Sequence, residues 1–394
     1  MTLPAMLTPL MASVSRKGLA KAFATTTSRR FLTTKPSSPT AATTAAQVEL
    51  KLNAGIGLGN VRDQMIPTYR PSRNSLYQHT PAPHTCTIIG APMTHGQPYV
   101  GTDSGPALLR EAGLRGMLSS LGWRVEDLPD LVFDKEPSTT TSTTASFKGN
   151  AKNPLLVGQG TKMLADIVEE KIKQGRFPLI LGGDHSIGMG SLAGILRARP
   201  NTGIIWVDAH ADLNTPAISE SGNMHGMPVG MLMEGVAPTE PIPGFEWLLD
   251  GPRLKPDSIV YVGLRDVDAE ERALIQNLGI AAYTMHDIDR YGIGQVMEMA
   301  LAHLLANDPN RPLHLSYDID AVDPTLAPAT GTKVRGGLNF REAHYVAEAV
   351  AVSGNLASSE IVELNPTLSH RKGADDTVDL GLQIITSLMG KSII

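Results

Sequence analysis

The sequence has little cysteine, few aromatic residues and no acidic residue in its first 48 positions. Its 394 residues include one cysteine, Cys86, so no disulfide can form within the chain, which fits a reducing or neutral compartment better than secretion. Cys86 lies in an apolar, strand-like run, and we interpret it as a buried thiol. No run of apolar residues is long enough to span a bilayer, so no membrane partner is expected.

The acid-free N-terminal segment is basic and rich in Ser, Thr and Ala. Its six basic residues are Arg16, Lys17, Lys21, Arg29, Arg30 and Lys35. This composition is typical of a mitochondrial transit peptide, and the Arg-Arg-Phe-Leu sequence at 29–32 resembles a matrix-processing site. We predict that residues 1–46 are a disordered presequence for the mitochondrial matrix. The alternative is a tail without a targeting role, and therefore a cytoplasmic protein.

The rest of the chain is net acidic, with 28 basic against 39 acidic residues, which argues against a nucleic-acid partner. Its length suits one large α/β domain. We predict a linker at 47–83. Its glycine-rich stretch at 55–60 resembles a dinucleotide-binding loop, but the last glycine and a leading strand are missing. Residues 135–148 are rich in Ser and Thr and predict a mobile surface insertion.

From residue 85 onward, short apolar strand patterns alternate with helix patterns. The predicted strands are 87–90, 177–181, 203–207, 258–263, 280–283, 313–319 and 356–364. The predicted helices are 104–121, 153–175, 187–199, 269–278, 293–307, 339–352 and 377–389. This alternation indicates an α/β fold in which a parallel sheet is covered on both faces, and ligands of such sheets bind beyond the carboxyl ends of the strands.

Three of the predicted strands end in clusters of metal-ligand residue types, at 179–186, 206–212 and 316–324. Together they supply four carboxylates and two imidazoles: His185, Asp208, His210, Asp212, Asp318 and Asp320. Alternate strand residues point to the same side, so Asp208, His210 and, if the extended geometry persists, Asp212 converge, as do Asp318 and Asp320. His185 comes from a glycine turn between a strand and a helix, where the backbone can bend sharply. One such motif alone is usually a cap or a tight loop, but three of them in one α/β pattern favour a shared site.

Oxygen-rich ligands with some imidazole suit Mn²⁺ better than a metal that prefers thiolates. The charges of four aspartates balance two divalent ions, and without ions these acids would repel one another in poorly solvated positions. Two ions that share carboxylates can hold a bridging hydroxide at neutral pH. The residues therefore predict metal-assisted hydrolysis.

At these residues the sequence resembles the arginase family of the ureohydrolases, over about residues 85–389 with the Ser/Thr-rich insertion as the main interruption. The resemblance implies that residues 84–394 form a catalytic domain with a three-layer α-β-α fold and a mostly parallel sheet of about eight strands. It implies hydrolysis of L-arginine to L-ornithine and urea, in the urea cycle or arginine catabolism. It also implies a homo-oligomer, a trimer or a hexamer.

The resemblance further implies two Mn²⁺ ions per subunit. One ion would be held by His185, Asp208, Asp212 and Asp318, and the other by Asp208, His210, Asp318 and Asp320. The bridging hydroxide would attack the guanidinium carbon, and Asp212 would pass its proton to the leaving amine. His225, in the Ser-Gly-Asn-Met-His-Gly segment at 221–226, matches the family's proton-shuttling histidine.

Seven further residues match the family's substrate contacts. The α-carboxylate would meet Asn214, Ser219 and Ser221, the α-ammonium Asp268 and Glu271, and the guanidinium Thr332 and Glu363. An anionic Glu363 is electrostatically suited to a cationic group. Two positions depart from the family pattern, because Glu220 replaces a small hydroxyl residue and Met227 replaces a common Gln.

Three rival functions remain open at this point. An agmatinase or another guanidino hydrolase would share the metal centre, but agmatine has no α-carboxylate for Asn214 and Ser221. A catalytically dead homologue would serve as a binding subunit, but the chain retains all six ligand types and His225. A dinuclear phosphoesterase would need basic groups for phosphate, whereas the predicted site is acidic.

Overall fold

The computed structural model describes residues 76–133 and 149–391. The predicted presequence, most of the predicted linker and the Ser/Thr-rich insertion at 135–148 lie outside the described residues. Residues 76–83, the last part of the predicted linker, pack against the domain. Tyr77 is fully buried there, and its hydroxyl donates a 2.8 Å hydrogen bond to the backbone carbonyl of Leu388.

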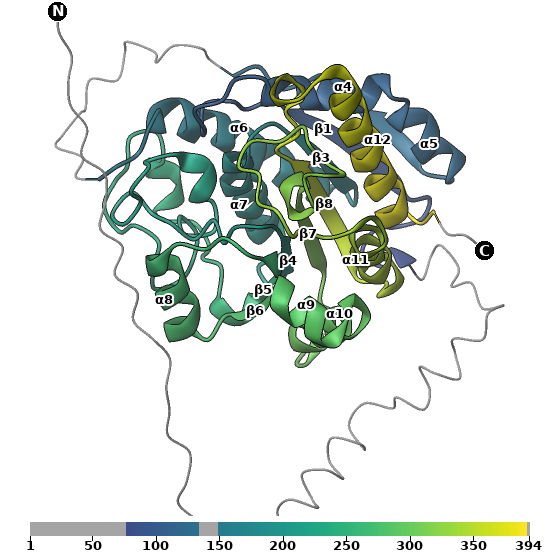
Figure 1. The fold of residues 1–394 in the computed structure, drawn as a ribbon. Helices are drawn as coiled ribbons and strands as arrows, with labels where there is room; N and C mark the ends of the chain where they lie inside the picture. The colour runs from purple at the N-terminus through teal and green to yellow at the C-terminus, as the bar shows by residue number, and fades with distance from the viewer. Residues whose placement is uncertain (1–75, 134–148, 392–394) are drawn as a thin grey trace, which may run out of the picture. The chain divides into compact units, whose positions relative to one another are not determined.

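Eight parallel strands form one sheet in the order β2-β1-β3-β8-β7-β4-β5-β6 (Figure 1). Their bounds are β1 Thr85–Ala91, β2 Arg124–Asp127, β3 Phe177–Gly182, β4 Gly203–Val207, β5 Ile259–Leu264, β6 Ala281–Thr284, β7 Leu313–Asp318 and β8 Leu356–Val362. Every strand pairing is parallel, which confirms the predicted sheet. The sequences of the central strands are continuous apolar runs because helices cover both faces of the sheet.

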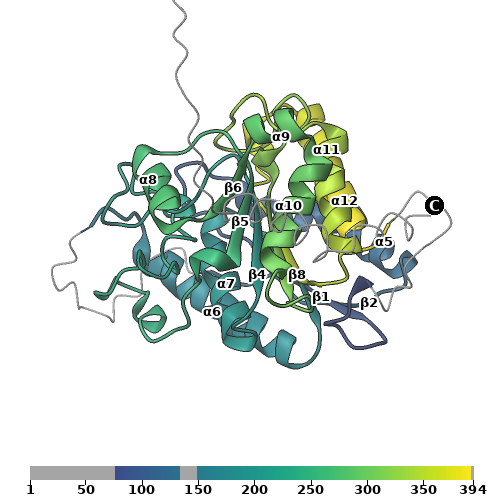
Figure 2. The same cartoon turned by 90° about the horizontal axis from the view of Figure 1, so that it is seen from below.

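Helices cover both faces of the sheet (Figure 2). The nine described α-helices are α4 Gly105–Glu111, α5 Leu114–Ser120, α6 Pro154–Lys173, α7 Gly188–Ala198, α8 Ala269–Leu278, α9 Met285–Tyr291, α10 Ile293–Leu305, α11 Phe340–Val352 and α12 Arg371–Leu388. Helices α6 and α7 pack on one face, whereas α4, α5, α10, α11 and α12 pack on the other. None of the described helices combines the length and the apolar composition needed to cross a bilayer.

Two apolar clusters, one on each side of the sheet, form the core. Alternate residues of a strand enter opposite clusters: in β4, Ile205 lies in one cluster, and Ile204 and Trp206 lie in the other. Cys86 in β1 is a fully buried free thiol, as predicted. Burial of each aliphatic side chain in these two clusters contributes about 1.5–3 kcal/mol to the stability of the fold. The sheet is therefore a rigid base for the side chains at its edge.

Three elements differ from the sequence-based expectation. The predicted helix at 104–121 is interrupted at Gly113, whose φ of 96° ends α4 and begins α5. Strand β2 was not predicted, because this edge strand is short, charged and only partly buried. Helix α9 was also not predicted, and it begins with a capping box between Thr284 and Asp287.

Candidate metal centre and active site

The carboxyl ends of five neighbouring strands, β3, β8, β7, β4 and β5, meet at one edge of the sheet. Each of these strands is followed within a few residues by side chains that the sequence assigns to the site. The turn after β3 depends on glycine, because a Cβ on Gly183 would lie 1.9 Å from the carbonyl oxygen of Met93. This turn places His185 at the start of a short 3-10 helix, where its ring faces the ends of β4 and β7.

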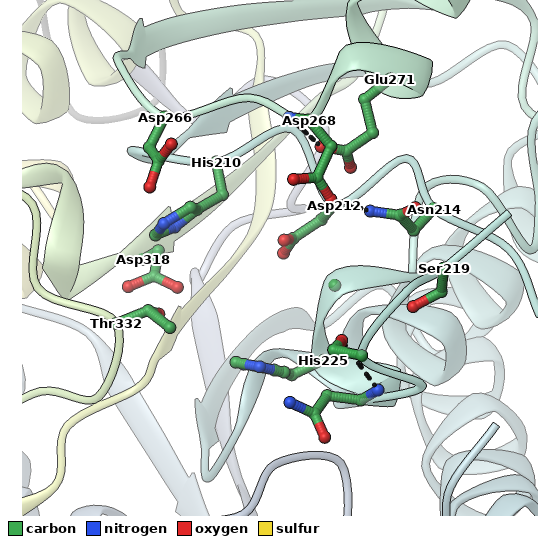
Figure 3. Close-up of a pocket in the computed structure, with 13 residues that line it drawn as sticks. His210, Asp212, Asn214, Ser219, His225, Asp266, Asp268, Glu271, Asp318 and Thr332 are labelled. Carbon is green, nitrogen blue, oxygen red and sulfur yellow. Dashed lines mark hydrogen bonds between the residues drawn. The ribbon is translucent and has the colours of Figure 1, made fainter. Parts of the chain in front are cut away.

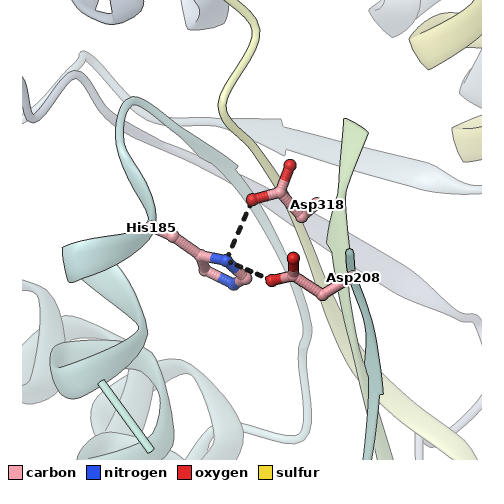
Figure 4. Close-up of side chains that lie close together, drawn as sticks. All are labelled: His185, Asp208 and Asp318. Atoms are coloured by element: carbon pink, nitrogen blue, oxygen red, sulfur yellow. Dashed lines mark ion pairs between the residues drawn. The ribbon is translucent and has the colours of Figure 1, made fainter. Parts of the chain in front are cut away.

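Three carboxylates converge on one imidazole nitrogen, and Figure 4 shows two of them, those of Asp208 and Asp318. The Nδ1 atom of His185 lies 3.1 Å from Asp208 Oδ2, 3.0 Å from Asp212 Oδ2 and 3.2 Å from Asp318 Oδ2. The side chain of His185 is 1% exposed, and its Nδ1 has no hydrogen-bond partner in acceptable geometry despite these short distances. Three oxygens and one nitrogen lone pair around a single point are the arrangement that a cation fits.

A second group of ligand atoms adjoins the first. His210 Nδ1 lies 3.1 Å from Asp320 Oδ2 and 3.4 Å from Asp208 Oδ1. Possible ligand atoms of Asp208, His210 and Asp320 all lie within 4.8 Å of one another, as do those of His185, Asp208 and Asp318. Asp208 belongs to both groups and directs one oxygen to each histidine. The structure therefore brings together all six predicted ligands, with Asp208 shared.

The charges of this centre are poorly balanced by the protein alone. Burial and the neighbouring Asp208 carboxylate raise the pKa of Asp212 to about 6. Burial and nearby carboxylates also raise the pKa values of Asp318 and Asp320. Burial would lower the pKa of His210, but Asp320 and Asp208 outweigh it and raise this pKa to about 12. A divalent cation would stabilise the ionised acids and the neutral histidines, so the residues present fit a metal centre.

Backbone strain also concentrates here. Three described residues other than glycine have positive φ, and two of them, Asp212 at 51° and Glu363 at 66°, belong to the site. Such conformations persist only where the surroundings enforce them, and they cluster at functional sites. In this conformation the Asp212 carboxylate lies 3.0 Å from His185 Nδ1.

A pocket opens over the metal centre (Figure 3). Its lining contains His210, Asp212, Asn214, Ser219, Ser221, Asn223, His225, Gly226, Asp266, Asp268, Glu271, Asp318 and Thr332. Six of the seven predicted substrate contacts are among these residues, and Glu363 lies behind His225. The departures from the family pattern lie elsewhere: Glu220 is exposed outside the lining and Met227 is fully buried in the core.

Sequence reasoning did not single out Asn223, Gly226 and Asp266, which also line the pocket. Asp266 stands two residues before Asp268, so the period of an extended chain could have placed both on one side. Asn223 and Gly226 lie in the segment of His225, and nothing in their residue types marked them.

The loop at 219–223 is braced by the segment that precedes α6. The Asn150 side chain donates hydrogen bonds to the carbonyl oxygens of Ser219 (3.1 Å) and Glu220 (2.9 Å). Lys152 donates from its backbone to Gly222 (2.8 Å) and from Nζ to Asn223 Oδ1 (2.9 Å). The hydroxyl oxygen of Ser219 accepts a bond from Gly222 N, so its own proton is available to a ligand.

Asp268 and Glu271 begin helix α8 as well as lining the pocket. Glu271 accepts hydrogen bonds from the backbone N–H groups of Leu213 (2.8 Å) and Asp268 (3.1 Å), and it therefore ties the end of β4 to α8. Burial, followed by the Asp212 charge, raises the pKa of Glu271 to about 7. Asp268 accepts a 2.9 Å bond from the side chain of Asn214 and is held at the pocket wall.

His225 and Glu363 form an ion pair at the opposite wall. His225 Nδ1 lies 3.1 Å from Glu363 Oε1, and the same oxygen accepts a bond from the backbone N–H of His185. The other carboxylate oxygen accepts from the Gln97 side chain at 2.8 Å. Burial would lower the pKa of His225, but the bond to Glu363 outweighs it and raises this pKa to about 9. The ion pair with Glu363 therefore favours the protonated form of His225 at neutral pH.

Comparisons with known proteins match this fold and site. Residues 84–390 match the family model described as the arginase family. An arginase of Glaciozyma antarctica is 44% identical over 314 residues, 79% of this chain and 89% of that protein. The human mitochondrial arginase-2 is 43% identical over 311 residues, 78% of this chain and 86% of that protein. A crystal structure of arginase from Bacillus subtilis, 39% identical, covers 79% of this chain and 100% of its own with a TM-score of 0.69.

Proposed function

Because this chain belongs to the arginase family and hydrolyses the guanidinium group of L-arginine to L-ornithine and urea, we propose that it holds two Mn²⁺ ions with six side chains of the described site. The ligands are His185, Asp208, His210, Asp212, Asp318 and Asp320. The observation that carries the proposal is the convergence of three carboxylates on the buried His185 Nδ1, which forms no hydrogen bond of acceptable geometry within the part of the chain that the structure describes. Carboxylate and imidazole ligands together suit Mn²⁺.

When bound, such a pair of divalent ions lowers the pKa of water so that hydroxide is available at neutral pH to attack the guanidinium carbon. The protein positions the substrate. The guanidinium would meet Thr332, which lines the pocket beside Asp320, and the negative charge of Glu363, held behind His225, complements the cation. Asp212, whose carboxylate lies 3.0 Å from His185 Nδ1, would accept the proton that the attack releases and pass it to the leaving amine.

His225 supplies a second proton, which converts the released amine to an ammonium group. Its ring is held by Glu363, and it is protonated at neutral pH because its pKa is raised to about 9. General acids in such positions contribute about 10²–10⁴-fold to a rate. Because His225 lines the pocket, its ring can then be reprotonated from solvent.

The outer half of the pocket fits an α-amino acid. The backbone N–H of Gly222 donates to the Ser219 hydroxyl oxygen, and that of Asn223 donates to the Ser221 hydroxyl oxygen. The proton of each hydroxyl can therefore be donated to an α-carboxylate. The Asp268 carboxylate across the pocket, supported by Asn214 and Glu271, fits an α-ammonium group. These contacts are the reason to prefer arginine over agmatine, which lacks the carboxylate.

Two further properties of the protein are its oligomeric state and its location in the cell. We propose a homotrimer or hexamer, supported by three large apolar side chains exposed along α11: Phe340 (46%), Tyr345 (39%) and Val352 (57%). We also propose that residues 1–46 direct the chain to the mitochondrial matrix, with the cytoplasm as the alternative. The composition of that segment and the similarity to human mitochondrial arginase-2 support matrix targeting.

The test is urea release by the full chain, loaded with Mn²⁺, from L-arginine and from agmatine side by side. Urea from arginine with little from agmatine is expected. A preference for agmatine would keep the metal centre and overturn the roles of Asn214, Ser219 and Ser221. Absence of urea from both substrates, with two ions bound, would overturn the proposed site chemistry. Sedimentation and a reporter fused to residues 1–46 test the oligomer and the location.

A further inference from the structure

The side chain of Gln97 contacts Glu363 with one end of its amide and leaves the other end unpaired. Its Nε2 atom donates a 2.8 Å hydrogen bond to Glu363 Oε2. Its Oε1 atom is buried and has no hydrogen-bond partner in the part of the chain that the structure describes. Gln97 as a whole is 7% exposed, so bulk water does not take the place of a donor. A buried acceptor without a donor is destabilising, and such an atom requires an explanation.

The backbone of the preceding residue fixes the place of Gln97. The N–H of Gly96 donates a 2.8 Å hydrogen bond to Asp184 Oδ2, and the Gly96 carbonyl oxygen accepts one of 3.0 Å from the backbone N–H of His225. A Cβ on Gly96 would lie 2.4 Å from Asp184 Oδ1, so a glycine is needed for this close approach. Gln97 is therefore held between the turn after β3 and His225, which lines the pocket.

The orientation of the Gln97 amide follows from the chemistry of its partner. The Glu363 carboxylate serves as an acceptor, because its Oε1 atom accepts from the backbone N–H of His185 at 2.8 Å and pairs with His225 Nδ1 at 3.1 Å. In a side-chain amide the nitrogen donates, and the oxygen only accepts. The NH₂ group of Gln97 must therefore face Glu363, and the Oε1 atom is left to accept from another group.

Gly331 leaves room beside this free acceptor. A Cβ at this position would lie 3.0 Å from Gln97 Oε1 and 3.7 Å from Glu363 Oε2, and the next atom, Tyr99 Cδ2, would be 3.8 Å away. The φ of Gly331 is not positive, so its backbone does not require a glycine. The next residue, Thr332, lines the pocket. An amide oxygen and a carboxylate oxygen therefore border one space beside the pocket wall, and a side chain at position 331 would fill it.

We propose that Gln97 is a further substrate-binding residue, whose Oε1 atom accepts a hydrogen bond from a terminal N–H of the L-arginine guanidinium while Glu363 pairs with its charge. The inference rests on the proposed guanidinium contacts of Glu363 and Thr332 and adds a residue to them. A guanidinium is planar and presents five N–H donors and no acceptor, so it can supply a donor to both oxygens at once. Two acceptors at fixed positions also fix the plane of the group that is attacked.

The first test compares Gln97→Leu with Gln159→Leu in the full chain loaded with Mn²⁺. Gln159 on α6 is the matched control, because its Oε1 atom also lacks a partner among the described residues, but it does not line the pocket. Urea release from L-arginine gives kcat and KM. Calorimetric titration with L-ornithine gives the affinity for an α-amino acid that has no guanidinium. Manganese content and thermal unfolding report the structural cost of each change.

Gln97→Leu is expected to lower kcat/KM for L-arginine by about 10- to 100-fold, the effect of losing a hydrogen bond to a charged group, and to keep the affinity for L-ornithine within about twofold. Gln159→Leu is expected to match the wild type in both measurements. A wild-type kcat/KM in Gln97→Leu, or equal losses for L-arginine and L-ornithine, would overturn the inference.

Gly331→Ala tests the space without removing the bond between Gln97 and Glu363. A methyl group there should displace the guanidinium and lower kcat/KM at least about tenfold, again with little effect on L-ornithine. Wild-type turnover in Gly331→Ala would overturn the inference, and this variant decides the matter if Gln97→Leu does not fold. Glu363→Gln separates the inference from the proposal on which it rests, since a wild-type kcat/KM in that variant would refute the proposed guanidinium contact itself.

Discussion

The indole ring of Trp206 stacks on the imidazole ring of His185, with 4.2 Å between ring centroids and 6° between planes. The same indole donates a 3.1 Å hydrogen bond from Nε1 to Asp208 Oδ2. Trp206 is the fourth residue of β4, and it is completely buried. One core residue thus orients two of the proposed metal ligands, and the hydrophobic core and the candidate metal centre are packed against each other.

Trp206→Phe should therefore weaken Mn²⁺ binding by about tenfold, because the smaller ring loses the bond to Asp208 and part of the stack. The unfolding free energy of the metal-free protein should also fall by about 1–3 kcal/mol. Titration of stripped protein with Mn²⁺ measures the first effect and chemical denaturation the second. Trp247→Phe is the matched control, since its indole donates to Gly158 O and does not line the pocket. Equal Mn²⁺ affinities in both variants would contradict the orienting role.

Asp208→Asn should abolish binding of both ions and reduce urea release to background. Asp208 directs one oxygen to each histidine, so replacing one oxygen with an amide nitrogen removes a charge that both ions share. Metal content after dialysis, measured by atomic absorption, is the readout. Asp287→Asn, which alters only the cap of α9, should retain both ions. Two ions retained in Asp208→Asn would count against a shared ligand.

The fold and the grouping of the six proposed ligands could be predicted because both follow short-range patterns. Buried parallel strands read as apolar runs, and the ligand types follow the strands directly, as at Asp208 and Asp318. The two-residue period of an extended chain was enough to predict that His210 lies near Asp208. Asp212 reaches the centre only through a positive φ, and no residue type in the sequence indicates this φ.

Other features depend on contacts between distant segments and could not be predicted. The bond from Asn150 to the carbonyl oxygens of Ser219 and Glu220 joins positions about 70 residues apart. The link from Ser316 to Glu360 depends on the register between β7 and β8, which a single sequence does not fix. The sequence placed Glu363 at the guanidinium, but it did not show that His225 and Gln97 share this carboxylate.

His225→Asn should lower kcat by at least about 100-fold and leave both Mn²⁺ ions in place. The histidine lines the pocket and is protonated at neutral pH, but it belongs to neither group of ligand atoms. Steady-state urea release and metal content are measured on the same samples. His303→Asn, on the exposed side of α10, should match the wild type in both. Unchanged turnover over neutral and alkaline pH would remove the proton-donor role.

The pair of His225 and Glu363 should make the stability of the metal-free protein depend on pH. The pKa of His225 is raised to about 9 in the folded state, so its stabilisation is complete below the unfolded pKa of about 6.5 and is lost as pH rises through about 9. The difference in unfolding free energy between wild type and His225→Asn should therefore fall between pH 6 and 10, by up to about 3 kcal/mol. Denaturation in chelator at several pH values measures it. A difference that is flat or grows with pH would contradict the ion pair.

Lys152→Met should raise the KM for L-arginine about two- to fivefold without changing kcat. The Lys152 ammonium contacts Asn223 at 2.9 Å, beside the serines proposed for the α-carboxylate. The exposed charge pair between this ammonium and the substrate carboxylate should contribute about 0.2–1 kcal/mol to substrate binding. Agmatine has no carboxylate, so its KM should stay the same, and the effect on arginine should shrink in 0.5 M salt because exposed charges are screened. Lys162→Met, which removes another exposed lysine of this region from its pair with Asp166, is the control. Equal shifts for both substrates would show that Lys152 acts on the loop and not on the carboxylate.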